Sequence, residues 1–312
     1  MNSTPHWPRD LFLISRHDSR HGGQASPTSM GSKAFNLERM LNCGLNVPPA
    51  LVIGSQHTAD PDGCVPAVTE VGLPALELVT GLQFGDARRP LILSVRSGSA
   101  VSMPGMMETL LNIGLCDETL PGLLRLTGNP RMVWDAYRRL IASYGEVVAG
   151  LPAGLFEDAI QRVTDGRDER QLDFAEMRAL ARTFLEIYAA QAGQPFPQDV
   201  RAQLLGAIRA VFSSWHSDKA VAYRKINGID ASLGTAVTIQ SMVFGNSGSR
   251  SGAGVGFTRD PSTGERRLWI DFLTNAQGED VVSGRRNAHG HEALAGVAPE
   301  AWKKLEESTA IL

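Results

Sequence analysis

The stretch LILSVRSGSAVSMPGMM, at residues 91–107, constrains the fold of this chain more than any other. Its apolar start, residues 91–95, predicts a short buried strand, whereas the small residues, glycines and proline at 97–105 predict a loop. Arg96 would then lie where a rigid strand ends and a flexible loop begins. Such a position can hold a charged group still while the loop closes over a ligand. The sequence therefore predicts a ligand-binding role for Arg96.

Two further glycine-bearing segments resemble phosphate-binding elements. MGSKAFN, at residues 30–36, opens a predicted helix and places Lys33 in its first turn, and GNSGSRSGAGVGF occupies residues 245–257. Small residues let backbone N–H groups approach a polyphosphate, and a helix start adds its positive end. Neither the P-loop pattern nor a complete GxGxxG is present. Taken singly, each segment is better explained as an ordinary turn.

Hydrophobic periodicity predicts a mixed α+β chain. Helical spacing covers residues 31–45, 131–148, 173–193 and 197–215, and the third of these begins with Asp173 and Glu176 in a capping-box relation. Short apolar runs at 11–15 and 47–54 predict strands. After Gly234 the period changes to two, which predicts strands at 235–245 and 266–273. An α-rich middle is thus followed by a β-rich lobe.

Composition excludes several classes of partner. The 312 residues carry a formal net charge of −3, which provides no electrostatic reason to expect nucleic acid or an anionic membrane. The three cysteines are too few and too widely spaced for a disulfide framework or a zinc motif. We find neither an apolar run near the ~20 residues that span a bilayer nor a signal-peptide pattern. The cytoplasm is therefore the expected compartment.

Taken in order, six segments resemble the amino-terminal nucleotide-binding domain of the pyruvate, phosphate dikinase family. They are GSKAFNLERM, LSVRSGSAVSMPGMMETLLNIGL, TGNPRMVWDAYRRLI, GTAVTIQSMVFGNSG, SGAGVGFTRDPSTGE and NAQGEDVVSG. The resemblance runs over essentially the whole chain. It implies an ATP-grasp-like α+β fold, in which two lobes clamp a nucleotide and a helical insertion lies between them. The implied domains are 1–115, a helical region 116–233 whose last helices pack back on the first lobe, and a carboxy-terminally truncated β-rich lobe 234–312.

The resemblance also implies a set of site residues and ligands. Lys33 and Arg96 would bind the phosphates of ATP, and Arg139 would neutralise charge at the transferring end. A hinge strand would read the adenine edge through its backbone while Met242 packs on the ring, and a glycine loop would cover the phosphates. The expected hinge residues are Gln240, Ser241, Met242 and Val243, and the expected loop residues are Gly252, Gly254 and Gly256.

For several residues, a structural role is an alternative to the functional one. Arg139 could form a structural ion pair, we expect Arg138 to be a solvated helix residue, and the methionines at 103, 106 and 107 could pack the loop. Glu279 and Asp280 could reach Mg²⁺ or lie at a surface strand end. His289 and His291 are expected to be exposed loop residues rather than metal ligands.

The chain departs from the family pattern in three ways. Gly31, Ser32, Lys33 and Ala34 stand where the family has Gly-Gly-Lys-Gly, and Ala100 replaces a common arginine. The strands that carry the family's acidic Mg²⁺ ligands do not appear before Leu312. The histidine domain and the pyruvate-binding barrel do not appear either.

Two functions follow as hypotheses. The first is an ATP-binding phosphotransferase module that passes the β-phosphoryl group of ATP to a histidine on another domain or chain. The second is a nucleotide-binding or interaction module without catalysis, which has lost the metal site. Whether the chain forms a homodimer stays open.

Overall fold

The computed structural model describes residues 7–282 and 291–312, and these residues form an α+β fold, as predicted. The chain divides into two compact units. Unit 1 is Met1–Leu41 with Asn46–Met242, and unit 2 is Asn42–Leu45 with Val243–Leu312. The three-part division expected from the sequence stays a prediction.

Unit 1 contains a six-stranded sheet in the order β2-β1-β3-β6-β4-β5, with every neighbouring pair antiparallel. The strands β1 and β3 are buried along their whole length, which explains why their sequences are continuously apolar. The bounds are β1 Leu11–Ile14, β2 Arg20–His21, β3 Ala50–Ile53, β4 Leu93–Gly98, β5 Thr109–Ile113 and β6 Ala236–Ser241.

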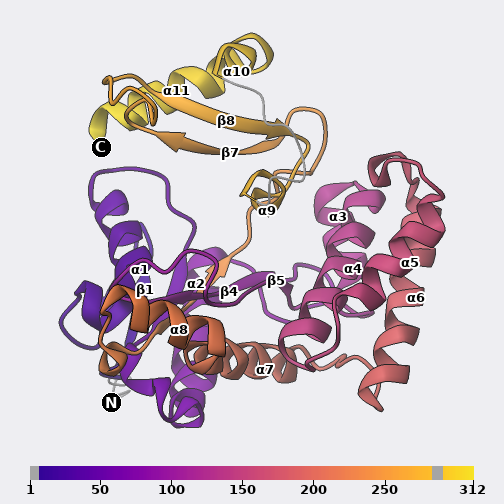
Figure 1. Ribbon diagram of the computed structural model, residues 1–312, viewed down its shortest axis with the longest axis horizontal. Coiled ribbons are helices and arrows are strands. Elements are labelled where there is room, and N and C mark those ends of the chain that lie inside the picture. The colour runs from indigo at the N-terminus through magenta and orange to yellow at the C-terminus, as the bar shows by residue number, and fades with distance from the viewer. Residues whose placement is uncertain (1–6, 283–290) are drawn as a thin grey trace. The chain divides into compact units, whose positions relative to one another are not determined.

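Helices cover both faces of this sheet (Figure 1). Met30 and Ala34 of α1 pack on one face, against Phe12 of β1 and Val52 of β3. On the opposite face lies Leu51, whose side chain would be 2.6 Å from a Cβ added at Gly72. The helices of unit 1 are α1 Pro27–Asn42, α2 Leu73–Thr80, α3 Leu120–Thr127, α4 Pro130–Val147, α5 Gly154–Thr164, α6 Phe174–Ala192, α7 Val200–Ser213 and α8 Asp218–Asn227.

Two strand predictions need correction. The strand expected at 91–95 is shifted, because β4 spans Leu93–Gly98, so Arg96 lies inside a strand and not at its end. The small residues Ser97 and Gly98 are common in loops, but here they are part of the strand. Their segment is extended because β4 pairs with β6 on one side and with β5 on the other. The strand β6, expected in the second lobe, lies between β3 and β4 in unit 1.

The helical middle follows the sequence closely. The capping box between Asp173 and Glu176 is present at the start of α6, and Gly193 ends that helix in the left-handed conformation. The helix α6 packs beside α4 and α5, which lie together in Figure 1. Local helix signals and helix–helix packing together account for this region.

The helical stretch Pro61–Thr80 is the one candidate membrane span in the described residues, by length and apolarity alone. It combines a 3₁₀ turn (η2, Pro61–Cys64), a π-helical turn (η3, Ala67–Gly72) and α2. Its inner side contacts β1 and β3. These contacts are those of a helix that covers a sheet.

Among its described residues, 243–282 and 291–312 with 42–45, unit 2 contains a two-stranded antiparallel sheet and three helices. The bounds are β7 Gly252–Phe257, β8 Trp269–Thr274, α9 Gly278–Val282, α10 His291–Val297 and α11 Pro299–Ile311. Ile270 and Phe272 of β8 form a small core with Leu294 of α10, and Trp302 of α11 packs against it. His291 therefore begins a helix and not a loop, whereas His289 lies outside the described residues.

Candidate functional site

The beginning of α1 approaches the end of β4 closely. Gly31 interrupts the helix with φ +78° and ψ 150°, so that the regular turns resume at Ser32. A Cβ added at Gly31 would be 2.1 Å from the carbonyl oxygen of Gly98. Only glycine fits here, because the left-handed φ and the close approach both exclude a side chain.

The two residues after Gly31 bind the same segment. The backbone N–H of Ser32 donates to the carbonyl oxygen of Ser99 at 3.0 Å, and its hydroxyl donates to the carbonyl oxygen of Ala100. The ammonium of Lys33 donates to the carbonyl oxygen of Ser97 at 3.3 Å. Lys33 is therefore held beside β4, one residue from Arg96.

Arg96 points to the α1 side of the sheet. In the register it lies opposite Thr238 of β6, and Thr238 lies opposite Val52, which packs under α1. Arg96 is partly buried, and burial lowers the pKa of its guanidinium. Within residues 7–282 and 291–312, no carboxylate forms an ion pair with this side chain, so its charge is uncompensated there.

Lys33 shares this electrostatic environment. The surrounding protein desolvates the ammonium, and the positive charge of Arg96 adds a smaller effect, so that the pKa of Lys33 is lowered. Solvent screens part of this effect, because Lys33 is exposed as a residue. Two like charges held together without an acidic partner in the described chain form a site that suits a polyanion.

The methionine loop after β4 packs on the protein. Met103 is buried against Trp215 and Ala220, and Met106 and Met107 pack on the same cluster. The ammonium of Lys219 in α8 binds the carboxylate of Glu108 at 2.6 Å. Of the two interpretations left open, the structure supports loop packing for these methionines.

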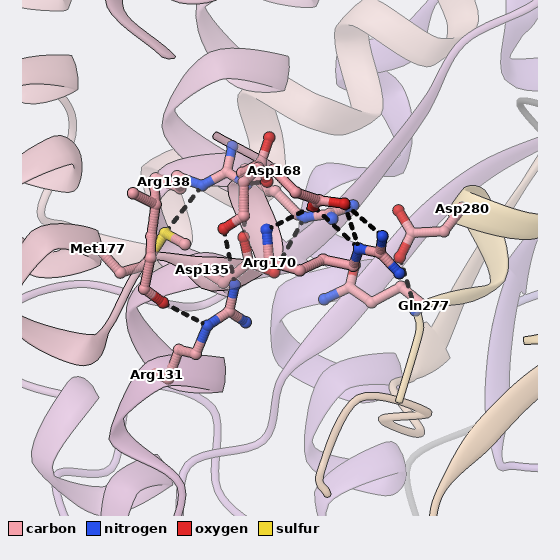
Figure 2. Close-up of polar contacts among 11 residues, drawn as sticks. Arg131, Asp135, Arg138, Asp168, Arg170, Met177, Gln277 and Asp280 are labelled. Atoms are coloured by element: carbon pink, nitrogen blue, oxygen red, sulfur yellow. Dashed lines mark hydrogen bonds and ion pairs between the residues drawn. The ribbon is translucent and has the colours of Figure 1, made fainter. Parts of the chain in front are cut away.

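Arg138 and Arg139 have different environments on α4. Arg138 is buried, so the expectation of a solvated residue is wrong. Its guanidinium forms ion pairs with Asp135 at 2.6 Å and with Glu169, and its Nε contacts the sulfur of Met177 (Figure 2). The spacing of three residues between Asp135 and Arg138 was a signal for this pair.

Arg139 binds the same buried carboxylate, through a hydrogen bond of 3.1 Å from its Nε to Asp135. Its side chain is 24% exposed, against 5% for Arg138. The arginines beside it hold the pKa of Asp135 below its usual range, although burial alone would raise it. Arg139 therefore has the structural partner that we considered, and its role at the transferring phosphate stays a prediction.

The expected hinge residues are partly engaged in unit 1. The amide of Gln240 donates to the carbonyl oxygen of Pro48 at 3.0 Å. The backbone N–H groups of Ser241 and Met242 donate to Pro49 at 3.0 Å and Ile92 at 2.9 Å. Unit 1 ends at Met242, and Val243, which is 74% exposed, begins the next segment of unit 2. Their adenine-binding role stays a prediction.

The expected glycine loop is a strand. Gly252, Gly254 and Gly256 alternate along β7, which pairs with β8 over its whole length. A Cβ added at Gly252 or Gly254 would be 2.8 or 2.9 Å from a carbonyl oxygen of β8. These glycines therefore allow close backbone approach within the hairpin, and phosphate binding by them stays a prediction.

Glu279 and Asp280 lie in the short helix α9. Asp280 accepts a hydrogen bond from the backbone N–H of Gln277 at 3.0 Å, which Figure 2 also shows, and Glu279 is exposed. In the described part of the chain, no three His, Cys, Asp or Glu side chains gather to hold a metal ion. Mg²⁺ binding by the two residues stays a prediction, and we assign no step to the metal.

Comparison with known proteins identifies the family. A family model described as "Pyruvate phosphate dikinase, AMP/ATP-binding domain" matches residues 75–291. The chain belongs to this family. Membership confirms the resemblance seen in the sequence and agrees with the ATP-grasp-like α+β class. The match includes Arg96 and Arg139, whereas Lys33 lies before it.

Curated relatives extend the likeness. The chain is 42% identical over 301 residues to "Pyruvate, phosphate dikinase 1, chloroplastic" of Zea mays, which covers 93% of this chain and 32% of the relative. It is 45% identical over 301 residues to "Pyruvate, phosphate dikinase" of Rhizobium meliloti (strain 1021), covering 89% and 33%. The chain thus spans about a third of the length of these relatives. The compartment stays a prediction, since only the plant relative is named chloroplastic.

Proposed function

We propose that this chain is the ATP-binding module of a pyruvate, phosphate dikinase type phosphotransferase. The observation that carries the proposal is the pair of cations, Lys33 and Arg96, held beside one another at β4 with no acidic partner in the described chain. Two fixed positive charges can neutralise the β- and γ-phosphates of a nucleotide. The family match, to an AMP/ATP-binding domain, supports ATP as the nucleotide.

In the proposed reaction a histidine of another domain or chain is the nucleophile. Its imidazole nitrogen attacks the β-phosphorus, the bond from that phosphorus to the oxygen shared with the α-phosphate breaks, and AMP leaves, so that the histidine carries the β-phosphate with the γ-phosphate still attached. Inorganic phosphate then attacks the γ-phosphorus, the bond between the γ-phosphorus and the bridging oxygen breaks, and pyrophosphate leaves the β-phosphoryl group on the histidine. Lys33 and Arg96 reduce the repulsion between the phosphates and the incoming lone pair, and hold the group in line. Arg139 is proposed to add charge at the transferring end. The acceptor histidine and its domain are proposals that rest on the family.

Binding and transfer are tested separately. Titration calorimetry of the 312-residue chain with ATP, AMP and inorganic pyrophosphate measures binding, and we expect heat with ATP and competition by pyrophosphate. Ligand at about 100 times its Kd would stabilise the fold by roughly 2.7 kcal/mol. ATP labelled in the β-phosphate, mixed with the chain and a separately produced histidine domain, would place label on that domain. Absence of ATP binding at millimolar concentration rejects the proposal.

The second candidate is a nucleotide-binding or interaction module without catalysis. The observation that favours it is the lack of a metal-ligand cluster in the described residues, together with the use of Asp280 to hold the start of α9. This module would bind ATP as tightly as the first candidate. It would leave the histidine domain unlabelled, so the transfer assay separates the two.

A further inference from the structure

We propose that Ser32 is a positioning residue, whose two hydrogen bonds hold the first part of the loop 99–108 and thereby set the place of Lys33 beside Arg96. The proposal deepens the proposed function, because it concerns the same anion site. It assigns no direct contact with the nucleotide to Ser32.

One short segment, residues 97–100, contacts three consecutive residues of α1, which are Gly31, Ser32 and Lys33. Gly31 touches the backbone at Gly98, Ser32 binds two carbonyl groups, and Lys33 binds a third. Ser32 is the central member and the one whose N–H and hydroxyl both donate to the loop. Ser32 and Ala100, two of the positions at which the sequence departs from its family pattern, are therefore in direct contact.

The first part of the loop has little else to hold it. Val101 is 42% exposed, and Ser102, Pro104 and Gly105 are exposed as well. The methionine packing on Trp215 and the ion pair of Glu108 anchor only the later part. Ser99 is buried, and its hydroxyl donates to the carbonyl oxygen of Val101 inside the same segment, whereas the hydrogen bonds to Ser32 are those that tie residues 99 and 100 to α1.

Loss of the Ser32 attachment would change the position of Lys33 relative to Arg96. The carbonyl of Ser97 that holds the Lys33 ammonium lies two residues before Ser99, which Ser32 binds. Ser97 itself stays paired in β4, but loss of the two Ser32 bonds would let the adjacent backbone of α1 shift, and Lys33 could then move away from Arg96, since their charges repel one another. Ser32 therefore helps to keep two repelling cations together before the anion arrives, which lowers the cost of ordering the site on binding.

The test compares Ser32→Ala and Ser32→Thr with Ser55→Ala. Ser55 is a matched control, because its hydroxyl donates to the carbonyl of Thr28 at 2.7 Å and so ties the start of α1 to a different segment. Hydrogen–deuterium exchange of the ligand-free chain reports the order of residues 99–108. Calorimetric titration with ATP measures the Kd of the site formed by Lys33 and Arg96.

We expect Ser32→Ala to exchange faster at residues 99–108 and to bind ATP with a Kd about fivefold higher, the effect of one ordinary hydrogen bond. Ser32→Thr, which keeps the hydroxyl, should restore both values. Ser55→Ala should leave both as in the wild type. A merely structural role would lower Tm equally in both alanine variants without a selective change in Kd.

Failure of this inference is distinct from failure of the proposed function. If the wild-type chain binds no ATP, the proposed function fails, and the exchange measurement still tests the loop attachment. Unchanged exchange in Ser32→Ala overturns the inference whatever the affinity for ATP. Faster exchange with an unchanged Kd overturns the positioning role.

Discussion

Lys33 and Arg96 lie side by side although their charges repel one another. The ammonium of Lys33 binds the carbonyl oxygen of Ser97 at 3.3 Å, immediately after Arg96, and the charge of Arg96 contributes to the lowered pKa of Lys33. A pair of this kind costs folding free energy unless an anion joins it. The arrangement is therefore explained better by ligand binding than by stability.

Replacing Arg96 with alanine should weaken ATP binding while the fold is retained. Loss of a charge-assisted contact to phosphate is expected to cost about 1.5 to 3 kcal/mol of binding free energy. The Tm should change little, because the described residues include no ion-pair partner that would be left behind. Calorimetry and thermal melting measure both quantities.

Arg209→Ala is a matched control for that variant, since it removes an exposed arginine that pairs with Asp62 at 2.6 Å. It should leave ATP binding unchanged. If Arg96→Ala bound ATP normally but melted much earlier than Arg209→Ala, Arg96 would be a structural residue.

The affinity for ATP should fall at alkaline pH because of Lys33. A phosphate binds the protonated ammonium, so the Lys33 contribution is present below its folded pKa and is lost as pH rises through it. That pKa lies below the ordinary lysine value of 10.5. Measurements of the Kd for ATP from neutral pH upward should show the loss of affinity below pH 10.5. The variant Lys33→Arg should keep its affinity over the same range, and a parallel loss in both proteins would contradict the assignment.

The same lowered pKa predicts how stability depends on pH. The folded chain binds the Lys33 proton less tightly than the unfolded chain, so this residue opposes folding below its folded pKa. That penalty disappears as pH rises toward the unfolded value. Lys33→Gln should therefore melt no lower than the wild type at neutral pH, while it binds ATP more weakly. A clear fall in its Tm would show that Lys33 stabilises the free protein.

Arg138 and Arg139 should differ sharply in their effect on stability. Arg138→Ala leaves the buried Asp135 without one of its partners, and breaking such a buried pair costs about 3 to 5 kcal/mol of unfolding free energy. Arg139→Ala should cost less, because its side chain is more exposed. Urea unfolding of both variants measures the difference. Equal losses would contradict the environments described for the two residues.

The stability of the methionine loop should depend on the volume of the side chain at Met103 and not on its sulfur atom. Met103→Ala creates a cavity beside Trp215, and we expect a loss of about 2 to 5 kcal/mol of unfolding free energy. Met103→Leu conserves volume and should cost less than about 1.5 kcal/mol. Leucine at 106 and 107 should leave the Kd for ATP unchanged. A large rise in Kd with normal stability would instead indicate contact between these methionines and the nucleotide.

Local signals in the sequence determined much of this protein. The capping box of Asp173 and Glu176, the end of α6 at Gly193 and the apolar strands β1 and β3 all follow from neighbouring residues. The order of the glycine-bearing segments was enough to identify the family. The prediction that Lys33 and Arg96 bind phosphate has the same origin, since both residues lie in these segments.

The tertiary structure alone decided where several of these residues lie. Arg96 is inside a strand because it pairs with Thr238, and Arg138 is buried because Glu169 and Met177 meet it from other elements. The hydrogen bond from Ser32 to Ala100 joins residues 68 positions apart. Periodicity and capping act over a few residues, whereas strand pairing, burial of charge and loop attachment depend on which distant segments the fold brings together.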